Sequence, residues 1–158
     1  MSCKEKELLK EAIDVALKTL YEKDKYLITN HNDRIENESH VSERGIVFRF
    51  GIYFQNELQK DFSEYNLDAE YNRDICAKKT LPEYPNGSYP DLILHKRGDN
   101  RFNLLVMEFK TWWNSDISRD EEKLKAFMDK NGEYNYEYGA SVILGKECYD
   151  IKLMPCDE

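Results

Sequence analysis

The sequence predicts one α/β domain in which a central mixed β-sheet is flanked by helices. Three observations lead to this prediction. Apolar residues recur at helical spacing in two early segments, two strand-like segments joined by a tight turn follow, and a third helical segment precedes two more strands. The predicted order is α-α-β-β-β-α-β-β. The 158 residues suit a single domain over 1–158.

Two amphipathic helices are predicted before the first strand, over about 4–22 and 42–60, with a polar loop over 29–39 between them. The apolar stripe of the first helix is Leu9, Ala12, Ile13, Ala16, Leu17 and Leu20. The stripe of the second is Val47, Phe50, Phe54 and Leu58. Glu43 lies one turn before Val47 on that same stripe, so an acid is expected at the buried side of the helix start.

Three strands are predicted next, over 65–73, 91–96 and 103–110. The first alternates apolar and polar residues, which indicates one face in the core, and a Pro- and Gly-containing loop over 81–89 follows it. The turn between the other two contains Gly98, Asp99 and Asn100, which tolerate positive φ. Residues 104–107 are all apolar, which indicates a strand buried on both faces.

A third helix is predicted over 118–130, followed by a buried strand over 138–144 and an edge strand over 148–154. Ser118 and Glu121 have the spacing of a capping box. Asp120 shares one helical face with the apolar residues Leu124, Phe127 and Met128.

Composition limits the classes of protein. Hydrophobic residues make up 41% and aromatic residues 13%, which excludes a disordered chain. No apolar run approaches the roughly 20 residues that cross a bilayer. The four cysteines form no CxxC pair and no secretory segment is recognised, so reduced thiols and a cytoplasmic location are expected. The net charge of −8 disfavours tight non-specific DNA binding, but a site for a divalent cation must itself be acidic.

The predicted hairpin brings two carboxylates together. With Asp99 and Asn100 as the turn, paired positions sum to 199 and Asp91 lies opposite Glu108, about 4.5–5.5 Å apart at Cβ. A turn one residue earlier makes them diagonal neighbours on the same face. The side chain of Lys110, two residues beyond Glu108, is expected on the same face, roughly 6.5–7 Å further along the strand.

This grouping suggests metal-dependent phosphodiester chemistry. Two facing carboxylates repel each other, and Mg²⁺ or Mn²⁺, which prefers oxygen ligands, would compensate the repulsion. Phosphodiester hydrolysis needs such a metal and a cation beside the developing charge. Lys110 is expected to supply that cation or to position the attacking water.

At these residues the chain resembles the PD-(D/E)XK nuclease superfamily. The matching stretches are Pro90-Asp91 and Glu108-Phe109-Lys110, with Glu43 near the start of the preceding helix. The order helix, three strands, helix, strand over about 42–144 matches the superfamily core, to which the helix over 4–22 is added. The resemblance implies a restriction-endonuclease-like fold and a catalytic set of Asp91, Glu108, Lys110 and Glu43. It also implies metal ligation by Asp91, Glu108 and the Phe109 carbonyl, with Glu43 as a supporting ligand.

Structural alternatives stand beside these roles. Glu43 also suits the helix dipole, and Asp91 also suits the start of a strand or a turn. For Glu70 a solvated or salt-bridged surface position is favoured over a place in the acidic cluster, which stays open as the alternative. Glu108 and Lys110 could form an ordinary polar face, but charges that end a doubly buried strand need a partner or a metal, which favours the catalytic interpretation.

A second group of residues could contact nucleic acid: His95, Lys96, Arg97 and Arg101 at the hairpin tip, and Trp112 and Trp113 after the lysine. Lys78 and Lys79 lie near the tip in sequence. A solvated turn explains the basic residues equally well, a lone histidine is more often structural, and one tryptophan is as well suited to the core. Asp120 and Lys123 are interpreted as a helix cap and surface charge.

The function expected from the sequence is Mg²⁺- or Mn²⁺-dependent cleavage of DNA, without an organic cofactor, as a homodimer or with a partner protein. Two alternatives stay open. One is a catalytically silent module of the same fold that binds DNA or protein, which the lack of a DNA-reading motif favours. The other is an RNA-directed nuclease.

Overall fold

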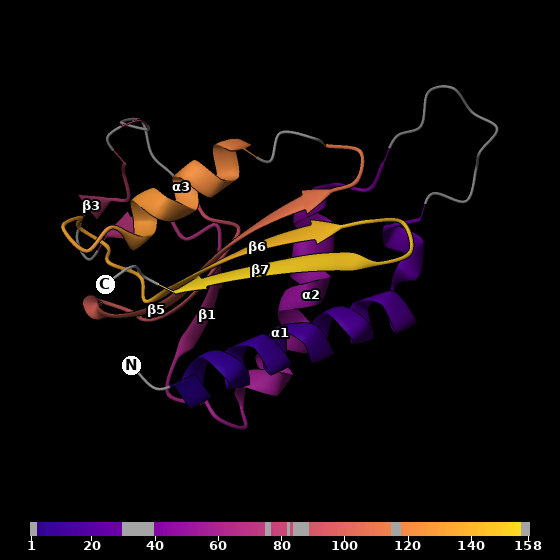
Figure 1. Ribbon diagram of the computed structural model, residues 1–158, viewed down its shortest axis with the longest axis horizontal. Coiled ribbons are helices and arrows are strands. Elements are labelled where there is room, and N and C mark those ends of the chain that lie inside the picture. The colour runs from indigo at the N-terminus through magenta and orange to yellow at the C-terminus, as the bar shows by residue number, and fades with distance from the viewer. Residues whose placement is uncertain are drawn as a thin grey trace.

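The fold is a five-stranded mixed sheet with helices on both faces (Figure 1), as the sequence predicts for an α/β domain. The computed structural model describes residues 3–29, 40–74, 77–81, 83, 89–114 and 118–155. The predicted loop over 29–39 lies outside these ranges apart from its first residue. Most of the predicted loop over 81–89 lies outside them as well.

Helices α1 (Cys3–Lys23) and α2 (Glu43–Leu58) pack together under one face of the sheet (Figure 1), and the short 3₁₀ helix η1 (Lys25–Leu27) follows α1. Both long helices begin and end within two residues of their predicted limits. Ser42 caps α2, since its hydroxyl accepts a hydrogen bond from the Gly45 N–H at 3.2 Å. No helix in the described ranges has the length and apolar character needed to span a membrane.

The strand order in the sheet is β1-β4-β5-β6-β7, with β5 at the centre. The strands are β1 (Asn66–Ala69), β4 (Leu92–Lys96), β5 (Asp99–Thr111), β6 (Tyr138–Leu144) and β7 (Tyr149–Pro155). Only β5 and β6 are parallel among these neighbours. Helix α3 (Ser118–Met128) connects them across the second face of the sheet, as a parallel crossover requires.

The β4–β5 hairpin has the predicted register at the candidate site but a different turn. Leu92 pairs with Met107, so paired positions sum to 199 and the next pair outward is Asp91 with Glu108. The turn itself is Arg97-Gly98, because Lys96 pairs with Asp99, and the turn predicted at 98–100 is therefore wrong by one to two residues. Gly98 supplies the positive φ of 82°. The pairing shifts register on either side of His95, so from Leu94 onward it has the predicted register although the turn falls earlier in the chain.

The two faces of the sheet have separate apolar cores. Leu92, Leu105 and Met107 belong to the core formed with α1 and α2. Ile93 and Val106 belong to a smaller core whose other members include residues of α3. Residues 104–107 are all buried, as predicted for a strand covered on both sides.

The region after β1 departs from the prediction. The strand expected over 65–73 ends at Ala69, because Glu70 adopts a φ of +45°, and Ala69 is exposed rather than buried. A two-stranded ribbon that the sequence did not indicate follows, formed by β2 (Arg73–Asp74) and β3 (Ala77–Lys78).

Candidate functional site

The candidate site lies where β5 extends beyond the start of β4. Because β4 begins only at Leu92, the next backbone N–H groups on that edge of β5 have no strand partner. The N–H of Phe109 donates instead to Asp91 Oδ2 at 2.7 Å. The N–H of Thr111 donates to Glu43 Oε2 at 3.3 Å. Two carboxylates from different segments therefore continue the hydrogen bonding of the strand edge.

The face of β5 that carries Glu108 and Lys110 is turned toward α3, whose residues pair with both side chains. Lys123 Nζ lies 2.7 Å from Glu108 Oε1, and Asp120 Oδ2 lies 3.0 Å from Lys110 Nζ. Glu108 is 4% exposed and Asp120 is 8% exposed. The interpretation of Asp120 and Lys123 as cap and surface charge is therefore wrong, since both side chains face the sheet.

Sequence reasoning missed these two residues although a signal was present. Glu108 and Lys110 are two apart on one face of a strand, and Asp120 and Lys123 are three apart on one face of a helix, with the charges in reverse order. Only the packing of α3 over β5 brings the complementary charges together.

Burial raises the pKa of both opposed carboxyl groups. For Glu108, burial is the largest cause and the charge of Asp91 adds to it; the two effects outweigh the opposing influence of Lys123 and raise the pKa to about 8. For Asp91, burial raises the pKa to about 6 against the hydrogen bond from Phe109 N–H. The negative charges of Glu43 and Asp120 raise it further.

Lys110 stays a cation in this environment. Burial lowers its pKa, but the close contact with Asp120 at 3.0 Å and the charge of that carboxylate, with smaller contributions from Glu43 and Asp91, outweigh burial, so the pKa is raised. A lysine in this state acts through its positive charge and not as a base.

The oxygen-bearing side chains of the site are of the type that ligates hard divalent cations. Glu43, Asp91, Glu108 and Asp120 are four carboxylates near two ammonium groups, which leaves two excess negative charges when all are ionised. Glu108 Oε1 and Asp120 Oδ2 are buried and have no aligned hydrogen-bond partner among the described residues. Their close polar contacts are with the ammonium groups of Lys123 and Lys110, respectively. Carboxylate oxygens of this kind are ligands for Mg²⁺ or Mn²⁺.

The side chains as folded do not form a closed ligand set. Among the described residues, no three His, Cys, Asp or Glu side chains converge closely enough to hold a metal ion. At Glu108, the Lys123 ammonium lies 2.7 Å from the carboxylate oxygen. In an extended strand the Phe109 carbonyl is on the same edge as its N–H, which bonds Asp91. Metal binding by these groups stays a prediction.

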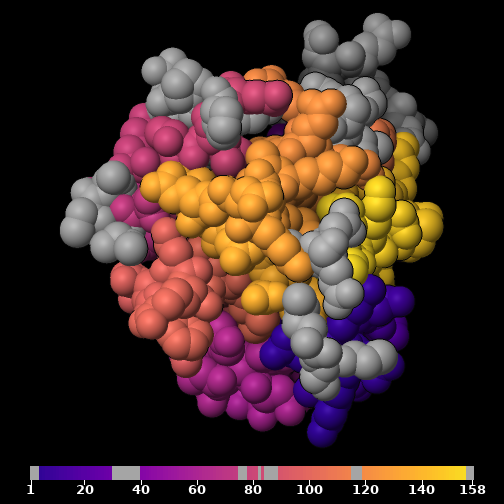
Figure 2. Space-filling model, turned by 60° about the vertical axis from the view of Figure 1, so that its left-hand side comes forward, coloured from indigo at the N-terminus to yellow at the C-terminus, as the bar shows by residue number. Residues whose placement is uncertain are grey.

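The basic residues of the hairpin tip lie at the other end of β4 and β5 from Asp91 and Glu108. His95 is buried and bonded to Asp68 at 2.9 Å, as expected for a structural histidine. Arg97 also pairs with Asp68, and Arg101 pairs with Asp99. Figure 2 shows this tip in coral at the margin of the molecule, beside the segment that follows α3. Nucleic-acid binding by His95, Lys96, Arg97 and Arg101 stays a prediction.

The tryptophans differ in their surroundings. Trp112 donates its indole N–H to the Ile28 carbonyl at 2.9 Å and carries Lys146 over its ring at 4.2 Å. Trp113 stacks on His40 with ring centroids 4.4 Å apart. Both tryptophans are half-buried and pack against the larger core. Trp112, which also bonds the Ile28 carbonyl, therefore has the core-packing role that the sequence allowed for one tryptophan.

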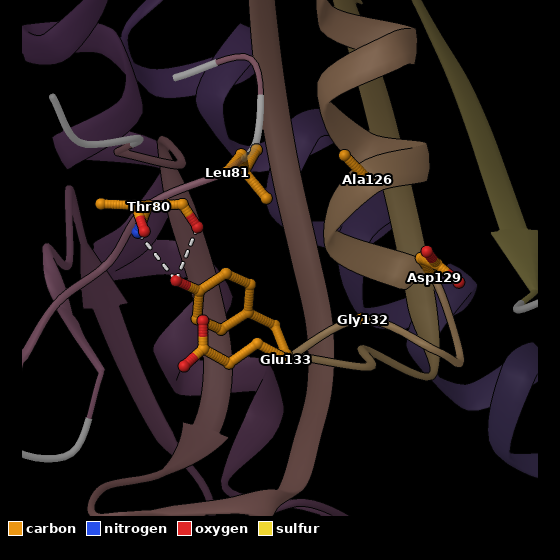
Figure 3. A pocket seen from close by; sticks show the side chains of 7 residues that line it. Thr80, Leu81, Ala126, Asp129, Gly132 and Glu133 are labelled. Carbon is orange, nitrogen blue, oxygen red and sulfur yellow. Dashed lines mark hydrogen bonds between the residues drawn. The ribbon is translucent and has the colours of Figure 1, made fainter. Parts of the chain in front are cut away.

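Two other features of the α3 face lie apart from this site. Lys79 is 1% exposed, donates to Tyr136 Oη at 3.1 Å and lies 4.4 Å from the Tyr134 ring centroid, so it cannot reach a phosphate backbone as the sequence suggested. Burial lowers its pKa to about 8. An open pocket of about 480 Å³ lies beside Thr80, Tyr134 and the carboxyl-terminal end of α3 (Figure 3), away from Asp120 and Lys123.

Glu70 is salt-bridged at the surface, as favoured from the sequence, since its carboxylate lies 2.5 Å from Arg44 Nε. Cys148 is a free thiol, and the other three cysteine side chains fall outside the described residues.

Comparisons of the chain with protein-family models, with curated proteins and with solved structures give no match. Fold and site define an α/β domain with a partly buried group of four carboxylates and two lysines beside the end of its central strand, of which Glu108 and Asp120 are buried.

Proposed function

We propose that the protein is a Mg²⁺- or Mn²⁺-dependent nuclease that hydrolyses phosphodiester bonds of DNA, with a restriction-endonuclease-like core. The observation that carries this proposal is the meeting of Asp91 and Glu108 across the β4–β5 pair, with Lys110 next on the same face of β5. The resemblance of Pro90-Asp91 and Glu108-Phe109-Lys110 to the PD-(D/E)XK pattern supports it.

In the proposed site Asp91, Glu108 and the Phe109 carbonyl hold the cation, and Glu43 supports them from the start of α2. A bound divalent cation polarises the phosphate and lowers the pKa of its water. Lys110 supplies a fixed positive charge for the developing phosphorane, since its raised pKa keeps it protonated. Asp120 positions Lys110 through the 3.0 Å contact. One such site cuts one strand, so a double-strand cut needs two copies of the chain.

A second candidate is a catalytically silent module of the same fold. The specific observation in its favour is that both lysines of the cluster are already paired with carboxylates, at 3.0 Å for Lys110 and 2.7 Å for Lys123. A closed network of this kind is also what a purely structural role would require.

The test is incubation of supercoiled plasmid, single-stranded DNA and single-stranded RNA with the protein and Mg²⁺ or Mn²⁺. Wild type is expected to nick DNA, and Lys110→Ala and Asp91→Ala to lose at least about 100-fold in rate, the size typical of removing one such electrostatic group. Glu122→Ala, an exposed acid on α3, is the control and keeps full rate. Equal nicking by all variants identifies a contaminant. Absence of cleavage with either metal supports the silent module. Cleavage of RNA alone shows that the substrate is RNA and not DNA.

A further inference from the structure

Helix α3 and strand β5 are joined by two ion pairs of different character. Lys110 reaches from the strand to Asp120 on the helix, while Lys123 reaches from the helix to Glu108 on the strand. The first pair orients a lysine of the proposed machinery. The second pair covers a carboxylate of the proposed metal site.

Lys123 has oxygen atoms from two segments around its ammonium group. Nζ lies 2.7 Å from Glu108 Oε1 and donates to the backbone carbonyl of Tyr89 at 2.8 Å. Tyr89 is only two residues before Asp91, so the ammonium lies between the Asp91 segment and Glu108. Carboxylate and carbonyl oxygens are the ligands that a hard divalent cation takes.

The contact between Lys123 and Glu108 is suited to exchange. Glu108 Oε1 lies 2.7 Å from Lys123 Nζ, but no well-aligned hydrogen bond to this oxygen is formed by the described part of the chain. The Lys123 side chain is 15% exposed and stands on a flexible four-carbon stem near solvent. An ammonium group held in this way can leave without unfolding of α3.

We propose that Lys123 is an exchangeable cation that occupies the metal position in the metal-free protein and leaves the Glu108 carboxyl group when a divalent cation binds. This inference rests on the proposed function, because it takes Glu108 as a metal ligand. Metal affinity is then set by competition with the protein's own cation.

The first test is the Mn²⁺ affinity of Lys123→Met, measured by electron paramagnetic resonance of free Mn²⁺. Methionine keeps the length and apolar stem of the lysine and removes the competing charge. The expected dissociation constant is about tenfold lower than that of wild type. Lys125→Met, an exposed lysine on the same helix, is expected to leave it unchanged. Lys110→Met removes a charge from the same cluster without touching Glu108, and its effect is expected to be clearly smaller.

The outcomes separate the two proposals. Mn²⁺ binding by wild type with equal or weaker binding by Lys123→Met overturns the exchange and leaves the nuclease proposal in place. Equal gains in Lys123→Met and Lys110→Met also overturn it, because the effect is then general electrostatics. Absence of specific Mn²⁺ binding in wild type and in Lys123→Met overturns the metal site and the exchange together.

A measurement on the unmodified protein covers the case in which Lys123→Met does not fold. Acetylation of lysines, followed residue by residue by mass spectrometry, is compared without metal and with saturating Mg²⁺. Lys123 is expected to react several times faster with Mg²⁺, while Lys125 is unchanged. A Lys123 rate that Mg²⁺ leaves unchanged or lowers overturns the exchange.

Discussion

Replacing Glu108 by glutamine should stabilise the metal-free protein at neutral pH. The pKa of Glu108 is raised from 4.5 to about 8, chiefly by burial and then by Asp91. At pH 7 the folded protein therefore keeps a proton on this carboxyl group that the unfolded chain releases. Each pKa unit corresponds to about 1.36 kcal/mol, so the difference of 2.5 units between pH 7 and the unfolded value costs about 3 kcal/mol. Glutamine is neutral in both states and removes this cost.

The sign of the pH dependence follows from the proton count. Between pH 4.5 and 8 the unfolded state holds fewer protons at this position than the folded state, so the free energy of unfolding of the wild type falls as pH rises. The decline levels off above the folded pKa. Below pH 4.5 both states are protonated, and Glu108→Gln and wild type should agree to within about 1 kcal/mol.

The assay is urea unfolding in EDTA at several pH values between 4 and 8. Glu122→Gln, at an exposed acid on the same helix as Lys123, controls for the loss of a surface charge and should change stability by less than about 0.5 kcal/mol. A Glu108→Gln protein that is less stable than wild type at pH 7 would refute the reasoning, because Glu108 would then be an ionised and well-compensated partner of Lys123.

Two further predictions concern the opposite end of the hairpin. Asp68→Asn should lose about 1–2 kcal/mol of stability at pH 7, because Asp68 bonds both His95 and Arg97. Burial opposes the lowered pKa of Asp68, but the bonds from Arg97 and His95 outweigh it. This stability is therefore fully present above pH 3.8 and decreases progressively as pH falls from there toward the lowered folded pKa; a difference from wild type in thermal unfolding that does not shrink between pH 4 and pH 2 would contradict this expectation. Gly98→Ala should cost about 1 kcal/mol in urea unfolding because of the φ of +82°. It should leave any nicking rate unchanged, and a loss of rate in a folded protein would place the tip in the site.

The helices and the central hairpin were predictable because their patterns are local. Periodic apolar residues located α1 and α2, and the buried run at 104–107 located the centre of β5. The register at Asp91 and Glu108 was predicted correctly although the turn was not, since irregular pairing around His95 compensates a turn that falls earlier in the chain.

The parts that were not predictable depend on packing between distant segments. The pairing of Asp120 and Lys123 with β5 requires α3 to lie over the strand, and no local pattern specifies that placement. The sequence alone favours an exposed position for the basic residue Lys79. In the fold, however, Tyr134 and Tyr136, which lie more than fifty residues further along the chain, enclose it. The early end of β1 depends on the single backbone conformation of Glu70.

The central claim, that Asp91 and Glu108 hold one divalent cation, is tested most directly by replacing that cation with Fe²⁺. With ascorbate and peroxide, bound Fe²⁺ generates radicals that cut the nearby polypeptide, and the fragments are mapped by mass spectrometry. Cuts are expected around residues 91 and 108–110, suppressed by excess Mg²⁺ and absent in the Asp91→Asn, Glu108→Gln double variant. Cuts at another acidic group, such as Asp74 and Glu133, or cuts that the double variant leaves unchanged, would contradict it.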